Sequence, residues 1–108
     1  MGYMRHHAIV VTSWKKELIQ EAHDKAKEIF NGTATEILQS TMNGYLSFFI
    51  ATDGSKEGWN DSNLGDLRRK RFINWCKKQV HEDGSSSLNW AELFYGDDED
   101  KARIVNHN

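Results

Sequence analysis

Residues 5–30 of the chain read RHHAIVVTSWKKELIQEAHDKAKEIF, and this stretch decides the expected fold. Its first part, 5–13, is rich in β-branched residues, which favour an extended strand. From 14 to 30 the apolar side chains recur every three or four residues, as on one face of a helix. Ser13 stands where a helix N-cap is expected, and Asn31 and Gly32 favour the helix end. The stretch therefore predicts a strand followed directly by an amphipathic helix.

The rest of the chain predicts a second unit of the same kind, joined to the first through a hairpin. Strands are expected at 35–42 and 45–52, on either side of Asn43-Gly44, a pair that accepts the positive φ angles of a tight turn. A second helix is expected to begin at Asp61 or Ser62 and to run to about Val80. Two further strands are expected, and they span 88–95 and 102–106.

This order, β-α-β-β-α-β-β, predicts an α+β fold. The expected architecture is a ferredoxin-like β-α-β-β-α-β arrangement with an extra C-terminal strand and two helices on one face of an antiparallel sheet. The chain has 108 residues and shows no linker, repeat or low-complexity segment. We therefore expect a single domain that spans residues 1–108.

Composition excludes several classes of protein. The chain carries 16 acidic and 14 basic residues, a formal net charge of −2, whereas a general nucleic-acid binder needs a clear basic excess. Its longest apolar runs, 8–11 and 48–51, are far too short to cross a bilayer, and no apolar segment of a secretion signal follows Met1. The single Cys76 cannot form an internal disulfide. Together these features predict a cytoplasmic protein.

The usual signatures of catalysis and metal binding are not found. The His7 and His81 motifs lack the hydroxyl residue that a two-histidine phosphoesterase needs two positions later. Cys76 falls on an apolar helix face, which predicts a buried thiol rather than a nucleophile. A calcium-like loop starts at Asp53 but has Leu64 where the bidentate glutamate should stand. We therefore expect no enzyme activity, metal or cofactor, and a solvated turn at the acidic run 97–100.

Two apolar surfaces remain after one core is assigned. The second helix carries one stripe with Phe72 and Cys76 and another with Leu64 and Trp75, which packs either on the first helix or on another subunit. The strand 88–95 carries large apolar residues on both faces. An apolar face that the monomer leaves uncovered marks a partner, so we expect self-association.

Phosphate-binding features occur in two places. The run Arg68–Arg71 points in four directions on a helix, so it is either a solvated face with salt bridges or a source of one arginine, Arg69, for an anionic ligand. The turn 84–87, Gly-Ser-Ser-Ser, offers several amides and hydroxyls. Combined with surface aromatics, these donors are typical of a nucleotide site.

Three segments carry a family resemblance: RHHAIVVTSW (5–14), NGYLSFFIATDGSKEGWNDS (43–62) and EDGSSSLNWAELFYGDD (82–98). They resemble the phage proteins that counter Thoeris immunity, the first described Thoeris anti-defence family, and the resemblance covers most of the chain. It implies a sponge that acts in the bacterial host cell as a homo-oligomer, a dimer or a hexamer. Such a sponge holds cyclic ADP-ribose-type signals made by a TIR-domain enzyme without cleaving them. Some relatives also hold cyclic oligonucleotide signals.

The expected ligand contacts rest on side-chain chemistry. Arg69 and Arg103 are the candidates for the phosphates, and Ser86 and Asn89 for donors to phosphate or ribose. Trp90 or Trp59 would stack the adenine. The other interpretations stay open: interface packing for Trp90, cross-strand pairing with Glu92 for Arg103, and a loop anchor for Trp59. Lys15 and Lys27 are expected on the solvated side of the first helix, without a role.

A rival hypothesis is a protein–protein inhibitor that occludes a host enzyme with the aromatic sheet face and the acidic hairpin 96–101, GDDEDK. A third is a small nucleic-acid accessory factor built on the arginine run. A small molecule that stabilises the purified protein would separate the first hypothesis from both.

Overall fold

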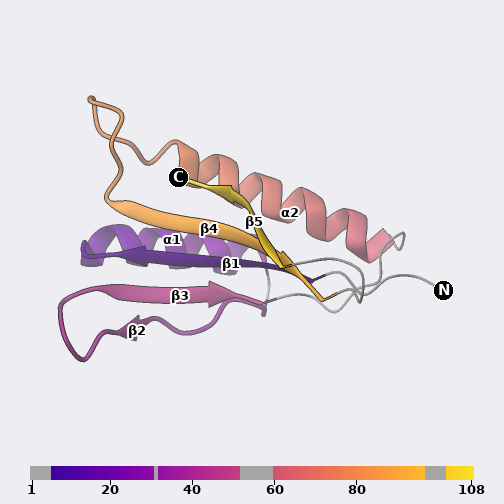
Figure 1. Cartoon of the computed structure of the whole chain (residues 1–108), viewed down its shortest axis with the longest axis horizontal. Coiled ribbons are helices and arrows are strands. Elements are labelled where there is room, and N and C mark those ends of the chain that lie inside the picture. The colour runs from indigo at the N-terminus through magenta and orange to yellow at the C-terminus, as the bar shows by residue number, and fades with distance from the viewer. Residues whose placement is uncertain (1–5, 31, 52–59, 97–101) are drawn as a thin grey trace.

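The computed structural model describes residues 6–30, 32–51, 60–96 and 102–108, which hold two helices and a five-stranded antiparallel sheet (Figure 1). In chain order the elements are β1 (His6–Ser13), α1 (Lys16–Ile29), β2 (Leu38–Gln39), β3 (Leu46–Ile50), α2 (Asn60–Lys77), β4 (Leu88–Tyr95) and β5 (Arg103–His107). The strands lie in the order β2-β3-β1-β4-β5. The predicted α+β class is confirmed.

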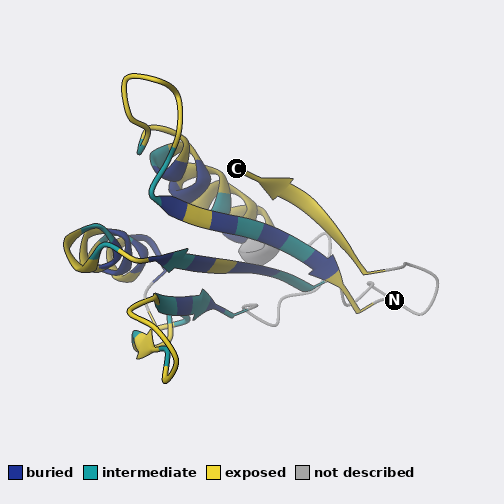
Figure 2. Cartoon of the chain, turned by 60° about the vertical axis from the view of Figure 1, so that its left-hand side comes forward, coloured by how far each residue is buried: buried dark blue, intermediate teal, exposed yellow. Residues whose placement is uncertain are grey.

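The core lies between the two helices and one face of the sheet. In β1, Val11 lies between Phe48 of β3 and Trp90 of β4, and all three side chains are buried. The helices add further buried side chains to this cluster: Ile19, Ala22 and Ala26 from α1, and Phe72, Ile73 and Cys76 from α2. Figure 2 shows the resulting alternation of buried and more exposed residues along β4. Both helices therefore cover the same face, and Cys76 is buried as predicted.

The first helix begins later than the sequence predicts, and Ser13 does not cap it. The N-cap position of α1 is Lys15, which makes no capping hydrogen bond with its side chain. Ser13 is instead the last residue of β1, and its Oγ accepts a hydrogen bond from the Lys15 amide at 3.0 Å. The serine hydroxyl therefore stabilises the strand-to-helix turn rather than the first turn of the helix.

The predicted tight turn at Asn43-Gly44 is wrong. Of the described residues only glycines 32, 84 and 96 have positive φ, so Gly44 does not use that freedom. The loop is wider and is closed by side chains: Ser40 Oγ accepts the Met42 and Asn43 amides, and Asn43 Oδ1 accepts the Tyr45 amide. The Ser40 amide still donates to the Tyr45 carbonyl, and β2 covers only two residues, Leu38–Gln39, of the predicted 35–42.

The remaining elements differ from prediction mainly at their ends. Helix α2 begins at Asn60, so the predicted start at Asp61 or Ser62 lies inside the helix, and it ends at Lys77 rather than near Val80. Strand β3 begins one residue later than expected. Strand β4 has the predicted bounds, and β5 is shifted by one residue. The predicted positions 52–59 and 97–101, which include Trp59, the calcium-like segment and the acidic run, lie outside the described residues.

The sheet face opposite the helices, here called the open face, is mostly apolar. It carries Val10, Thr12, Phe49, Ala91, Leu93, Tyr95 and Ile104. Val10, Tyr95 and Ile104 are 38, 37 and 59% exposed. Phe94 and Trp90 point the other way and are each only 4% exposed, so the aromatic side chains of β4 lie mainly in the core.

The two stripes predicted on α2 have different environments. Trp75 packs against the core and stacks on Phe72 with ring centroids 6.1 Å apart, whereas Leu64 and Leu67 are exposed. Arg71 of α2 forms an ion pair with Glu28 of α1, in which Nη2 of the arginine lies 3.4 Å from Oε1 of the glutamate. The packing interpretation thus holds for Trp75, and the exposed leucines remain unpacked in the monomer.

Candidate functional site

A cavity of about 660 Å³, here called the helix-end cleft, lies where α1 begins and α2 ends. It is lined by Trp14, Lys15, Lys16, Glu17, Leu18, Glu21, Lys78, Gln79, Val80, His81 and Ser87. Small-molecule sites in proteins typically enclose about 300–1,000 Å³. The cleft therefore has room for a ligand of nucleotide size.

Ser13, next to Trp14 in the chain, connects two of the segments that line this cleft. It is completely buried, and besides accepting the Lys15 amide its Oγ donates a hydrogen bond to the Ser87 carbonyl at 2.7 Å. One hydroxyl thus joins the start of α1 to the segment that enters β4. Nearby, His81 Nε2 lies 2.8 Å from Ser87 Oγ, which ties the end of α2 to the same segment.

The cleft combines positive charge with an exposed aromatic ring. Lys15, Lys16 and Lys78 line it, opposed by Glu17 and Glu21, so the fixed charges leave a positive excess. The Trp14 side chain is more than half exposed, and Lys15 Nζ lies 5.4 Å from the centre of its ring. A cation at this distance is attracted by the ring and restrains it. The arrangement suits a flat anionic ligand.

The first turn of α1 adds backbone donors to the cleft. Because no side chain caps this helix, the first-turn amides of α1 are not occupied by a capping group. Amides at a helix N-terminus, together with the helix dipole, favour a negatively charged group. These amides therefore add hydrogen-bond donors for an anion to the positive charge of the three lysines.

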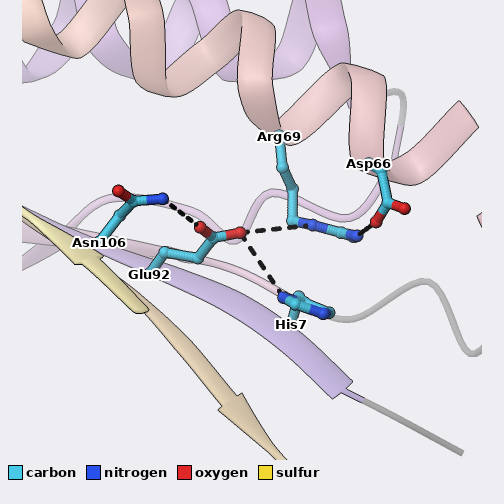
Figure 3. A network of polar contacts seen from close by, with 5 residues as sticks. All are labelled: His7, Asp66, Arg69, Glu92 and Asn106. Atoms are coloured by element: carbon cyan, nitrogen blue, oxygen red, sulfur yellow. Dashed lines mark hydrogen bonds and ion pairs between the residues drawn. The ribbon is translucent and has the colours of Figure 1, made fainter. Parts of the chain in front are cut away.

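A buried polar network joins α2 to the sheet at a distance from the cleft (Figure 3). Its centre is Glu92 of β4, which is 7% exposed. Asn106 Nδ2 of β5 donates to Glu92 Oε1 at 2.9 Å, while Arg69 Nε and His7 Nδ1 lie 3.5 and 3.6 Å from Oε2. Arg69 is paired on its other side with Asp66. The network therefore holds two helix residues and three strand residues together.

Electrostatics keep the central carboxyl ionised. Burial alone would raise the pKa of Glu92, but the side chains of His7 and Asn106 and the charge of Arg69 outweigh it, so the pKa lies below the ordinary glutamate value. The network can thus supply a buried negative charge that orients the Arg69 guanidinium and the His7 ring.

The predicted phosphate ligands Arg69 and Arg103 have partners within the fold. Arg69 is 12% exposed along its side chain and is shared by Asp66 and Glu92. The Arg103 guanidinium lies 4.3 Å from the centre of the Phe94 ring, and its strand partner is Phe94 rather than Glu92. These two predicted ligands therefore lie away from the helix-end cleft.

The other predicted contacts are also dispersed. Ser86 Oγ donates to the Gln79 carbonyl at 2.5 Å and accepts the Leu88 amide, so it stabilises the turn. Asn89 is exposed, whereas the Trp90 ring is covered by the core, with its Nε1 buried and unpaired among the described residues.

The turn before Ser86 is held by a second serine. The amide and hydroxyl of Ser85 donate to Asp83 and lower the pKa of that carboxyl.

Sequence reasoning missed the residues that the cleft brings together. Trp14 and Lys78 were not singled out, and Lys15 was expected to have no role. The available signal was local: an aromatic and two lysines directly follow β1, and two lysines stand at the end of α2. What the sequence could not supply is that these two segments meet at one end of the molecule.

The described residues contain no cluster of three or more His, Cys, Asp or Glu side chains placed to hold a metal ion. Burial raises the pKa of the Cys76 thiol to about 12, which keeps it protonated and unreactive. Of the helices in the described ranges, neither is long and apolar enough to span a membrane.

Comparison with protein-family models, curated proteins and solved structures finds no match to this chain.

Proposed function

We propose that this protein is a phage-encoded sponge that binds cyclic ADP-ribose-type signals without cleaving them and so blocks Thoeris defence. The observation that carries this proposal is the helix-end cleft, where Trp14 and three lysines meet the uncapped start of α1. The same chemistry would admit cyclic oligonucleotide signals. The resemblance of segments 5–14, 43–62 and 82–98 to the anti-Thoeris family supplies the biological setting.

The cleft matches the parts of such a ligand. A cyclic ADP-ribose isomer presents a pyrophosphate, two riboses and an adenine. Lys15, Lys16 and Lys78 would pair with the pyrophosphate, and Trp14 offers a ring face to the adenine. His81 and Ser87, already 2.8 Å apart, would supply polar contacts to ribose. In this proposal the protein binds its ligand and contributes no nucleophile or acid–base pair.

We also propose that the fold is ferredoxin-like with an added strand. The order β2-β3-β1-β4 with all-antiparallel neighbours, and β5 beside β4, supports this arrangement. In it, the segments after β1 and before β4 lie at one end of the sheet because these two strands are neighbours and antiparallel. That adjacency brings Trp14 and Ser87 to the same cleft.

Calorimetry with cyclic ADP-ribose tests the proposal. Trp14→Ala and Lys78→Ala should each weaken binding roughly tenfold to a hundredfold, because they remove a stacking face and a charge-assisted contact. Lys27→Ala, on an exposed part of α1 outside the cleft, is the matched control and should bind as wild type does. The bound nucleotide should be recovered intact after the protein is denatured.

Arg69→Ala and Arg103→Ala serve as a second arm that separates the two candidate sites. If these variants lose binding while the Trp14 and Lys78 variants keep it, the ligand lies away from the helix-end cleft. Conversion of the nucleotide to a linear product in proportion to protein concentration would contradict sequestration.

A second candidate function is inhibition of a host protein through the open face. The exposed Val10, Tyr95 and Ile104 favour it, because contiguous apolar surface marks a binding face. The acidic hairpin of the same hypothesis lies outside the described residues. Failure of nucleotides to bind, together with a stable complex between the protein and a TIR-domain enzyme, would favour this function over sequestration.

A further inference from the structure

A second, smaller cavity of about 180 Å³, here called the His7 cavity, lies near the start of β1 and the end of β3. Its lining includes the basic side chains of His7, Arg68 and Arg69. It also includes the apolar side chains of Ile9, Phe30 and Ile50. The helix-end cleft lies beyond the opposite end of β1, and the two cavities share no lining residue.

The polar network orients two of these basic groups. Arg69 uses Nε toward Glu92 and Nη2 toward Asp66, and no described residue occupies its remaining nitrogen, Nη1. A guanidinium has five N–H donors, so several remain for a ligand. His7 turns Nδ1 toward Glu92, which leaves Nε2 on the side of the ring away from the carboxylate (Figure 3).

A neighbouring cavity shows why an anion would choose the His7 cavity. That neighbour, of about 370 Å³, shares His7 and Arg69 but is also lined by the carboxylates of Asp66 and Glu92. None of the described residues that line the His7 cavity is acidic, and Arg68 adds a second guanidinium there. Among the described residues, an anion therefore meets carboxylates in the neighbouring cavity and cationic or neutral groups in the His7 cavity.

We propose that His7, Arg68 and Arg69 bind a phosphomonoester group, with Glu92 as the residue that positions His7 and Arg69. Two planar guanidinium groups suit a tetrahedral oxyanion, which each can contact through two parallel hydrogen bonds. The small volume accepts a phosphate on a short carbon group, and the apolar lining residues Ile9, Phe30 and Ile50 disfavour a second charged substituent. This site is independent of the nucleotide proposed for the helix-end cleft.

Calorimetry and thermal shift with inorganic phosphate, against chloride at matched ionic strength, test the site in the wild-type chain. Arg68→Gln should weaken phosphate binding roughly tenfold, because it removes one charge-assisted contact. Arg68 is exposed and forms no ion pair with another described residue, so this variant should fold normally. Arg71→Gln, an exposed arginine of the same helix paired with Glu28 outside the cavity, is the matched control and should bind phosphate as wild type does.

Two further measurements fix the ligand class and separate the two sites. Dimethyl phosphate, which has only two unsubstituted oxygens, should bind more weakly than inorganic phosphate, and His7→Asn should reduce phosphate affinity. Cyclic ADP-ribose binding should not change in Arg68→Gln, whereas Lys78→Ala should weaken the nucleotide and leave phosphate unaffected. Absence of phosphate binding at millimolar concentration, or equal affinity in Arg68→Gln and wild type, would overturn the proposal.

Discussion

At the scale of single residues, Glu92 stands out because its carboxylate is buried. It lies in a row of apolar neighbours that includes Trp90 and Phe94, and it is 7% exposed. A buried carboxylate is tolerated only when it is paired and hydrogen-bonded. Arg69, His7 and Asn106 meet that need, so the carboxylate of Glu92 connects β4 to α2, β1 and β5.

Glu92→Gln should destabilise the protein at neutral pH by roughly 3 kcal/mol, because it leaves the buried Arg69 without its central partner. The folded pKa of Glu92 lies below the ordinary value, so the carboxylate stabilises the fold above that value. This contribution is lost as pH falls through the folded pKa. Urea unfolding at neutral and acidic pH should therefore show the gap between wild type and variant closing as pH falls.

The control for this prediction is Glu28→Gln, which removes an exposed carboxylate paired with Arg71 and Lys25. Exposed pairs of this kind contribute little, so unfolding should be nearly unchanged. A Glu92 variant as stable as wild type at neutral pH, or a gap that does not depend on pH, would show that the network is not stabilising.

At the scale of elements, one hydroxyl sets the geometry of the β1–α1 turn. Ser13 Oγ accepts the Lys15 amide and donates to the Ser87 carbonyl, so it couples a turn near the N-terminus to one 74 residues later. Lys15 and Ser87, which these two bonds connect, both line the helix-end cleft. The stability of this turn and the affinity of the cleft should therefore change together.

Ser13→Ala should cost about 1–3 kcal/mol of unfolding free energy, since it leaves a carbonyl and an amide without their partner. It should also weaken cyclic ADP-ribose binding. Ser47→Ala is the matched control, because it removes a serine hydroxyl from the open face, where Ser47 contacts Thr12 at 2.8 Å. That control should affect stability less and leave binding unchanged. Equal effects of the two substitutions would contradict a role of Ser13 in shaping the cleft.

At the scale of the whole molecule, we propose that copies of the chain meet through the open face. Trp75, for which the sequence leaves contact with another subunit open, and Phe94 of β4 pack in or against the core, so a charge at either would disturb folding itself. Val10 lies on the open face between Phe49 and Ala91 and is 38% exposed. It is therefore the better position at which to test association.

Light scattering at micromolar concentration should report a dimer or a larger assembly for the wild-type protein. Val10→Lys should lower the mass toward that of a monomer, because it places a charge at the centre of the open face. Leu67→Lys changes the other exposed apolar surface, on α2, and should leave the assembly intact; loss of the assembly in this variant alone would place the contact on α2 instead. A monomeric wild-type protein would contradict assembly through this face.

Much of the fold could be predicted because it is local in origin. The apolar period of α1, the alternation of β4 and the burial of Cys76 each follow from spacing along a few turns or residues. The type and order of elements were therefore correct. The predicted ends of elements were wrong where side chains bond to nearby backbone amides. Ser13 does so before α1, and Ser40 and Asn43 do so before β3.

The sequence by itself thus determined the α+β class, the seven elements in their order, and the apolar character of both faces of β4. Only the tertiary structure decided that Trp14 and Lys78 share a cleft, and that Arg69 and His7 both contact Glu92. The reason is physical. Periodicity records which way a side chain points from its own element, whereas these contacts depend on how distant elements align across the β1–β4 register.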